Sequence, residues 1–306
     1  MDLSLTELSY LGGLFDAEGS INIISPKHSV TGTRQTLVQV SLGNTHYPTI
    51  MRLNGIVPGH LFEAKAKPNC KPCWQYELRY KAAREFMEMI RPYLRIKRRQ
   101  ADLVVDHDNF VRDHNVTSKR QPSEEWAMIR AGYVAQLVAL HKETFTETER
   151  TEVNEWVANY NFDTLTEEDK SYIAGVFDGE GSVCITEEAR GRYGSAATKV
   201  KCNVANTDYR VAAYFRQLFG GGITHRPAQR ETQRDWYVWQ SSAAKADTFF
   251  STIAPYSFIK KPQIDVALAH AQWIKDNPWR KPTQPPESYR AQRHFFKTEI
   301  DRLKTL

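Results

Sequence analysis

The chain has 306 residues, of which 41% are hydrophobic and 25% are charged, and its formal net charge is +5 at pH 7. This balance is typical of a soluble globular protein and excludes a largely disordered chain. No apolar run approaches the roughly 18 residues of a transmembrane helix, and the N-terminus resembles neither a secretion signal nor a transit peptide. We therefore expect a soluble protein that acts in the compartment where it is made, with no membrane partner. The mildly basic charge is compatible with a polyanionic partner but does not require one.

The first part of the chain predicts a series of helices and strands. Ser4-x-x-Glu7 has the spacing of a capping box and predicts a helix that ends near Gly19. Apolar residues alternate in SINII (20–24) and in TLVQVSLGN (36–44), which predicts two strands. A helix is expected from Tyr47, then two strands around 61–64 and 74–80, then helices over 82–90 and after Lys97. The predicted order is αββαββα, an α+β fold.

The same order is expected a second time, because the chain repeats itself. Residues 9–20 read SYLGGLFDAEGS and residues 171–182 read SYIAGVFDGEGS, an offset of 162 with eight identical positions. The offset persists farther on, and the sequence matches Trp74 with Trp236. After one inserted residue, Lys97 matches Lys260. Such a register indicates a duplication whose halves fold alike.

Four segments follow from this organisation. We expect an N-terminal repeat over 1–113, a helical linker over 114–165 and a C-terminal repeat over 166–275. Residues 276–306 form a proline-rich segment followed by a basic helix from Tyr289. His107 and His114 lie in a polar stretch without metal-ligand spacing and are interpreted as surface or linker residues.

The cysteines offer a weaker signal. Cys70 and Cys73 have the spacing of half a zinc site or of a redox pair, but no second pair follows, and the neighbouring prolines favour an ordinary loop. With Cys184 and Cys202 there are four cysteines, too few for a disulfide framework in a chain of this size.

The repeated segment combines small residues with acids. Gly12 and Gly13, like Gly175, would let two helix backbones approach closely. If the two copies pack side by side, Glu18 and Glu180 converge at the negative ends of two helix dipoles. A divalent cation, Mg²⁺ or another such as Mn²⁺, would relieve this repulsion and could assist phosphodiester hydrolysis. The alternative is a pair of acidic helix ends that only face solvent.

Both segments resemble the signature of the LAGLIDADG homing endonucleases, in the single-chain form with two motifs, over about 9–108 and 171–273. The resemblance implies two αββαββα repeats related by a pseudo-twofold axis, with the motif helices at the central interface. Two antiparallel sheets would form a saddle on double-stranded DNA. It further implies an intron-encoded, monomeric enzyme that makes a metal-dependent double-strand break in a long asymmetric site and leaves short 3′ overhangs.

The resemblance also assigns roles to residues at the motif ends. The last acid of each motif is the family's metal ligand, which falls on Glu18 and Glu180. The preceding backbone carbonyl, at Ala17 and Gly179, joins the coordination in many members.

Two further pairs carry over, each with an alternative. Asn44 and Asn206 match an amide that holds water in the active site, and the alternative is a turn residue before a helix. Lys97 and Lys260 match a catalytic-site lysine, and the alternative is a basic helix start that contacts the DNA backbone.

Alternate residues on each strand would face the DNA, because one face of each sheet must be buried. The expected outward residues are Ser20, Asn22, Gln39, Ser41, Gln75, Glu77 and Arg79 in the first repeat, and Ser182, Thr186, Lys199, Lys201, Asn203, Arg234 and Tyr237 in the second. The expected phosphate contacts in loops are Lys27, Arg34, Lys65, Lys67, Arg190, Arg192, Arg226 and Arg230. Arg98, Arg99 and Lys261 are expected to contact phosphates too. The two outward sets differ, which predicts an asymmetric target.

Two other functions are compatible with the same fold. A maturase would bind the RNA of its host intron, and Arg290, Arg293 and Arg302 in the C-terminal helix are a weak indication of this. A binding-only DNA regulator would be expected to lose the two acids, which are both present.

Overall fold

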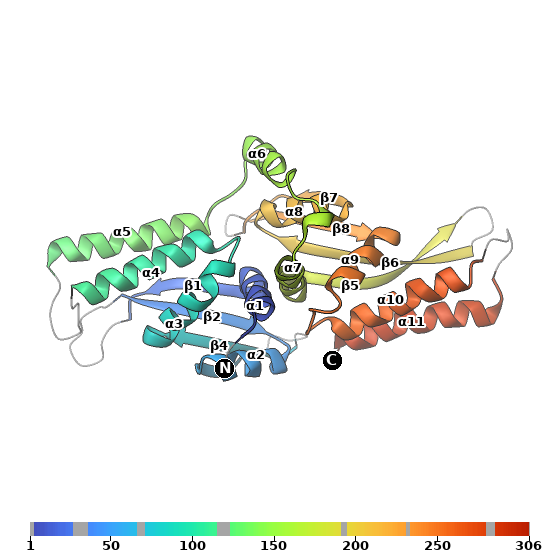
Figure 1. Ribbon diagram of the computed structural model, residues 1–306, viewed down its shortest axis with the longest axis horizontal. Coiled ribbons are helices and arrows are strands. Elements are labelled where there is room, and N and C mark those ends of the chain that lie inside the picture. The colour runs from blue at the N-terminus through green and yellow to red at the C-terminus, as the bar shows by residue number, and fades with distance from the viewer. Residues whose placement is uncertain are drawn as a thin grey trace. The chain divides into compact units, whose positions relative to one another are not determined.

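The computed structural model describes residues 3–26, 36–65, 71–114, 123–190, 195–230, 233–279 and 285–305. The chain divides into two compact units, Met1–Glu143 (unit 1) and Thr144–Leu306 (unit 2) (Figure 1). Within the described ranges, no helix has the length and apolar character needed to cross a membrane. Lys27, Arg34, Lys67, Cys70 and Arg192 lie outside these ranges, as does the side chain of Arg190.

Unit 1 has the predicted αββαββα order, followed by one more helix. Its elements are α1 (Leu5–Glu18), β1 (Gly19–Ile24), β2 (Leu37–Asn44), α2 (Tyr47–Ile56), β3 (His60–Ala64), β4 (Cys73–Arg79), α3 (Tyr80–Ile90), η1 (Arg91–Tyr93), α4 (Arg98–Asp113) and α5 (Glu124–His141). The strands form an antiparallel sheet in the order β1-β2-β4-β3.

Unit 2 begins with two connecting elements and then repeats the plan of unit 1. Its elements are α6 (Glu147–Val157), η2 (Phe162–Thr164), α7 (Glu167–Glu180), β5 (Gly181–Arg190), β6 (Ser195–Asn206), α8 (Tyr209–Phe219), β7 (Gly222–Arg226), β8 (Trp236–Ser242), α9 (Ala244–Ile253), α10 (Lys261–Asp276) and α11 (Glu287–Thr305). The sheet order is β5-β6-β8-β7, again antiparallel.

The motif helices begin and end as the sequence predicts. The Ser4 hydroxyl accepts a hydrogen bond from the Glu7 backbone N–H at 3.2 Å, and the Glu7 carboxylate accepts one from the Ser4 N–H at 3.0 Å. Thr166 and Asp169 form the same capping box on α7. α1 ends at Gly19, where a Cβ atom would collide with the Phe15 ring, so the turn into β1 requires glycine.

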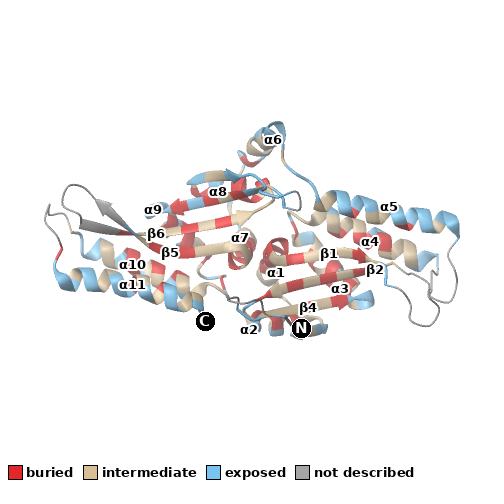
Figure 2. Ribbon diagram, turned by 180° about the vertical axis from the view of Figure 1, so that it is seen from behind, coloured by how far each residue is buried: buried red, intermediate tan, exposed pale blue. Residues whose placement is uncertain are grey.

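Gly12 has a role inside unit 1. A Cβ atom there would lie 2.7 Å from the carbonyl oxygen of Tyr93 in η1, so the glycine lets η1 pack directly on α1. Residues 9–17 of α1 are all buried, which is typical of a helix that is covered on every side (Figure 2).

The final helix of each unit is part of the repeat. α5, which falls in the predicted linker, packs on α4 and β1, and α11 packs on α10 and β5 (Figure 1). The two helices share large side chains at matched positions, an offset of 163 apart: Trp126 with Tyr289, Arg130 with Arg293, Tyr133 with Phe296, and Leu137 with Ile300. The duplication therefore extends one helix beyond the αββαββα core.

A histidine lies under each of these helices. His107 is 1% exposed and shares a hydrogen bond with the Thr36 hydroxyl at 3.0 Å, and its ring meets that of Tyr133 edge to face at 5.5 Å. His270 repeats the arrangement with Thr198 at 2.9 Å. The interpretation of His107 as a surface or linker residue is wrong, because its side chain is buried and meets Thr36, the residue just before β2 and 71 positions away in the chain.

The strand β8 corrects the match between the two repeats. Asn44 pairs with Trp74, whereas Asn206 pairs with Tyr237, so the counterpart of Trp74 is Tyr237 and not Trp236. Tyr237 is 1% exposed, and the prediction that it faces outward is wrong. The inserted residue lies before β8, and this shift turns Val238, Gln240 and Ser242 to the open face of the sheet.

The buried histidines make the stability of the fold dependent on pH. Burial lowers the pKa of His107 and of His270 to about 4. The Asp108 charge opposes this shift at His107, whereas the nearby Arg130 and Arg293 reinforce the shifts of His107 and His270. The unfolded chain binds these protons below an ordinary pKa of about 6.5. The free energy of unfolding is therefore highest above pH 6.5 and falls as the pH drops toward 4, by up to on the order of 3 kcal/mol per histidine.

Urea unfolding between pH 4 and 8 measures this effect. The double variant His107→Gln, His270→Gln keeps a hydrogen-bonding group at both positions but removes the titration, so its stability should vary much less between pH 6.5 and 4. Equal pH dependence of the variant and the parent protein would refute the assignment.

Candidate active centres and sheet faces

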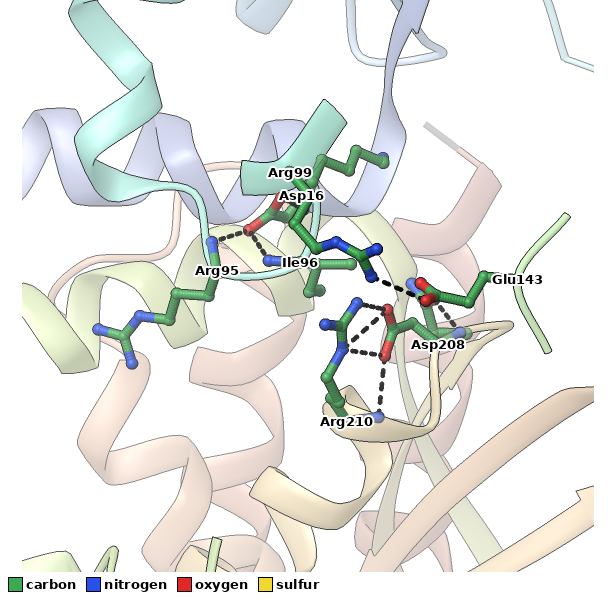
Figure 3. A network of polar contacts seen from close by, with 9 residues as sticks. Asp16, Arg95, Ile96, Arg99, Glu143, Asp208 and Arg210 are labelled. Atoms are coloured by element: carbon green, nitrogen blue, oxygen red, sulfur yellow. Dashed lines mark hydrogen bonds and ion pairs between the residues drawn. The ribbon is translucent and has the colours of Figure 1, made fainter. Parts of the chain in front are cut away.

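Asp16 anchors the end of the first motif helix. It is 1% exposed, and its carboxylate accepts hydrogen bonds from the backbone N–H groups of Arg95 (2.7 Å), Ile96 (3.0 Å) and Lys97 (2.8 Å). Figure 3 shows the first two of these bonds. Burial raises the pKa of Asp16, while the Lys97 charge and the three N–H donors oppose that shift. The carboxylate thus fixes the segment that leads into α4.

Asp178 anchors the second motif helix in the same way. It accepts hydrogen bonds from the Ser257 hydroxyl at 2.6 Å and from the backbone N–H groups of Phe258 (2.7 Å), Ile259 (2.9 Å) and Lys260 (3.0 Å). No role was predicted for Asp16 or Asp178 from the sequence, although both occupy the same position in the two repeated segments.

The lysine that each aspartate holds reaches back to the end of the motif helix. The Lys97 ammonium donates hydrogen bonds to the carbonyl oxygens of Gly19 (2.6 Å), Phe15 (3.0 Å) and Ala17 (3.4 Å). Carbonyls in the last turn of a helix lack intrahelical partners and attract a cation. Lys97 therefore lies at the turn that carries Glu18.

Lys260 occupies the corresponding place in unit 2. Its ammonium donates to the carbonyl oxygen of Asp178 and lies 3.5 Å from that of Gly179. Each unit thus brings a predicted lysine together with the residue before its predicted acid.

Glu18 and Glu180 are the last residues of α1 and α7, and both side chains are half-buried. In each unit a carboxylate and the preceding backbone carbonyl, of Ala17 or Gly179, are the oxygen donors that a hard divalent cation prefers. Among the described residues, no group of three or more histidine, cysteine, aspartate and glutamate side chains could hold a metal. A cation at either helix end would complete its coordination with water or substrate oxygens.

Asn44 and Asn206 make the hydrogen bonds of turn residues. The side-chain oxygen of Asn44 accepts from the backbone N–H of His46 at 2.8 Å, and that of Asn206 accepts from Asp208 at 2.8 Å. Each bond closes the turn between a strand and the helix that follows it. Asp208 is in turn ion-paired with Arg210 (Figure 3).

The open faces of the two sheets carry most of the predicted outward residues. Buried and less buried residues alternate along β1, β2 and β6, so that Asn22, Gln39 and Lys201 lie on the open face (Figure 2). The corrected register of β8 adds Gln240 and Ser242, which the sequence match had missed. Cys184 also lies on this face as a free thiol.

Several predicted phosphate contacts are paired with acids of their own unit. Arg98 contacts Asp102 at 3.1 Å, and Arg99 contacts Glu143 at 2.8 Å (Figure 3). Lys261 contacts Asp265 on α10. The exposed predicted phosphate contacts are Lys65, Arg226 and Arg230. Arg234, predicted as an outward strand residue, is exposed but lies before β8.

The anchoring role of the two aspartates can be tested by stability. Asp16→Asn or Asp178→Asn exchanges one acceptor oxygen for a donor that faces backbone N–H groups, and each should lower the free energy of unfolding by about 2–3 kcal/mol. Asp106→Asn, at an exposed position of α4, is the control and should change it by less than about 0.5 kcal/mol. Urea unfolding curves that coincide for Asp16→Asn and the control would contradict the anchor.

Comparison with known proteins identifies the fold. No protein-family model and no curated protein sequence matches the chain. Among solved structures, the LAGLIDADG meganuclease I-AabMI bound to uncleaved DNA has a TM-score of 0.65 and 13% identity, over 95% of this chain and 98% of that one. I-SmaMI bound to an uncleaved DNA target with calcium ions has a TM-score of 0.64 and 14% identity, over 98% and 99%. The LAGLIDADG homing endonuclease I-GzeII in complex with its DNA target has a TM-score of 0.62 and 13% identity, over 95% and 96%. The chain therefore has the fold of the LAGLIDADG homing endonucleases, whose signature its two repeated segments resemble.

Proposed function

We propose that this protein is a site-specific DNA endonuclease of the LAGLIDADG type, acting as a monomer on a long asymmetric double-stranded target. The observation that carries the proposal is a glutamate at the end of a buried motif helix, beside an ammonium group, formed twice in one chain. The similar structures I-AabMI, I-GzeII and I-SmaMI are complexes with DNA, and that of I-SmaMI contains calcium ions, which supports a DNA substrate and a divalent cation.

Each unit would supply one centre, for one strand of the DNA. Glu18 with the Ala17 carbonyl, and Glu180 with the Gly179 carbonyl, would hold Mg²⁺ or Mn²⁺. Such an ion, when bound, polarises a phosphoryl oxygen and lowers the pKa of a bound water. Hydrolysis would leave short 3′ overhangs, as the family resemblance implies.

The lysines would act on the charge of the scissile phosphate. Lys97 and Lys260 are held by carbonyl oxygens at the motif-helix ends, so each ammonium is positioned before substrate arrives. A preorganised cation stabilises the negative charge that develops in phosphodiester hydrolysis. Asp16 and Asp178 fix the lysine backbones and would thereby set the position of each ammonium group.

The maturase alternative has less support from the C-terminal helix. Arg293 stacks on the Tyr289 ring at 4.5 Å, and Arg302 forms an ion pair with Glu299 at 2.6 Å. These contacts engage two of the three arginines that suggested RNA binding. DNA cleavage is therefore the function that we propose.

The two glutamates provide the direct test. A cleavage selection on a randomised duplex library with Mg²⁺ would first identify the target. Glu18→Gln and Glu180→Gln should each reduce double-strand cutting at that target by at least about a hundredfold, because each removes the charge that binds the cation. Target binding, measured without Mg²⁺, should change little.

Asp163→Asn, an exposed acid in η2, is the matched control and should cut at the parental rate. Undiminished double-strand cutting by both glutamine variants would overturn the assignment of the two centres. Tight, specific binding by a parent protein that never cuts would instead favour the binding-only regulator.

A further inference from the structure

The duplication allows the two open sheet faces to be compared position by position. In unit 1, Gln39 on β2 pairs with Arg79 on β4, and Glu77 lies two residues before Arg79 on the same face. In unit 2 the corresponding pair is Lys201 and Ser242, with Gln240 in place of Glu77. At these three positions unit 1 has an acid and two donors, whereas unit 2 has a lysine and two neutral side chains.

Glu77 is held by both of its neighbours. Its Oε1 atom lies 2.7 Å from Arg79 Nε, and its other carboxylate oxygen accepts a hydrogen bond from the side-chain amide of Gln39. The Glu77 side chain is 15% exposed, whereas that of Arg79 is 47% exposed. The carboxylate therefore lies below the surface that Arg79 presents.

This arrangement leaves donors on Arg79. A guanidinium has five N–H donors in a planar fork, and one carboxylate engages a single edge of it. Because Glu77 contacts Arg79 at Nε and the Arg79 side chain is 47% exposed, the outer edge of the fork is the part left for a partner on the open face. Glu77 also cancels the charge of Arg79, which makes the pair a poor site for phosphate alone.

We propose that Glu77 is a positioning residue for base recognition, which holds Arg79 so that its outer edge reads one guanine in the half-site bound by unit 1. The inference rests on the proposed function, since it assumes a duplex on the open face of the sheet. Arginine bidentate to guanine O6 and N7 is the commonest specific contact in the major groove. A fork that is already held loses less conformational freedom on binding.

Glu77 could instead read a base itself, as an acceptor for the cytosine amino group. One of its oxygens already accepts from the Gln39 amide and the other is ion-paired with Arg79, which favours the positioning role. In unit 2, Lys201 is a flexible point charge with no planar fork, and we expect it to add salt-dependent affinity without base preference.

A binding selection distinguishes these roles without requiring cleavage. The full chain would be incubated in EDTA with a randomised duplex library, and bound sequences would be compared among the parent, Glu77→Gln, Arg79→Lys and the control Lys201→Gln. The parent should prefer guanine at one position of one half-site, by a factor of about 5 to 150. Arg79→Lys keeps the charge but should lose most of that preference.

Glu77→Gln should move two quantities in opposite directions. The guanine preference at the same position should fall at least about fivefold, because the fork is no longer held. Binding to a 30-base-pair duplex of unrelated sequence should become tighter and more salt-dependent, because Arg79 gains an uncompensated charge. Tighter non-specific binding follows from the loss of any acid that faces DNA, so the loss of guanine preference is the readout that identifies the positioning role. Lys201→Gln should weaken binding to all sequences alike and reduce the salt slope by about one.

Three results would overturn the inference. An unchanged guanine preference in Glu77→Gln would show that Arg79 does not need its partner. A change from cytosine to adenine preference in Glu77→Gln, with no effect of Arg79→Lys, would show that Glu77 reads the base. Binding by the parent without any sequence preference would overturn both this proposal and the site specificity of the enzyme. The two catalytic centres would still be tested separately, by whether Mg²⁺-dependent cutting requires Glu18 and Glu180.

Discussion

The buried carboxylate at the end of each motif helix is the constraint on which the rest of each unit depends. A charge in the interior is tolerated only when hydrogen bonds replace the water that it loses. Asp16 receives three backbone donors and Asp178 receives three together with a hydroxyl, all from the segment before α4 or α10. These hydrogen bonds join parts of the chain about eighty residues apart. They align α4 with the motif helix α1 in unit 1, and α10 with the motif helix α7 in unit 2. Two residues farther on, Glu18 and Glu180 lie nearer the surface, so neighbouring acids have separate structural and chemical tasks.

Much of the fold could be predicted because its signals are local. The capping residues Ser4 and Thr166, the alternation along β2 and β6, and the repeated acidic segment all act over a few residues. The site was less predictable, because its contacts join distant segments. His107 reads as a surface residue until Thr36 is known to lie beside it. Trp236 and Tyr237 are adjacent aromatic residues, and only the pairing of Tyr237 with Asn206 decides which one is buried. Helices α5 and α11 share spaced large side chains but little identity, since a helix face accepts many residues of suitable size.

The two units differ most in the side chains that lie outside the hydrophobic core. Inside, each keeps an aspartate anchor, a lysine on the helix end and a histidine hydrogen-bonded to a threonine, which directly precedes β2 in unit 1 and lies in β6 in unit 2. The hydrogen-bond donors and acceptors of these groups pair with one another. Substitution of one residue would therefore leave its partner buried without a hydrogen bond. On the open faces, Gln39, Glu77 and Arg79 correspond to Lys201, Gln240 and Ser242. Such positions can change without disturbing the interior, which explains how one ancestral unit gave two unlike surfaces on a common framework.

The helices that complete each repeat also protect the sheets. β1 and β5 are terminal strands, and a terminal strand exposes backbone donors and acceptors that can pair with another molecule. α5 packs on β1, and α11 packs on β5, the longer of the two strands. The opposite edges, β3 and β7, are only five residues long, which limits the pairing that they could support. The C-terminal helix therefore acts as a barrier to strand-to-strand association, and a chain that ended after α10 would be expected to aggregate through β5 even with both of its acidic centres intact.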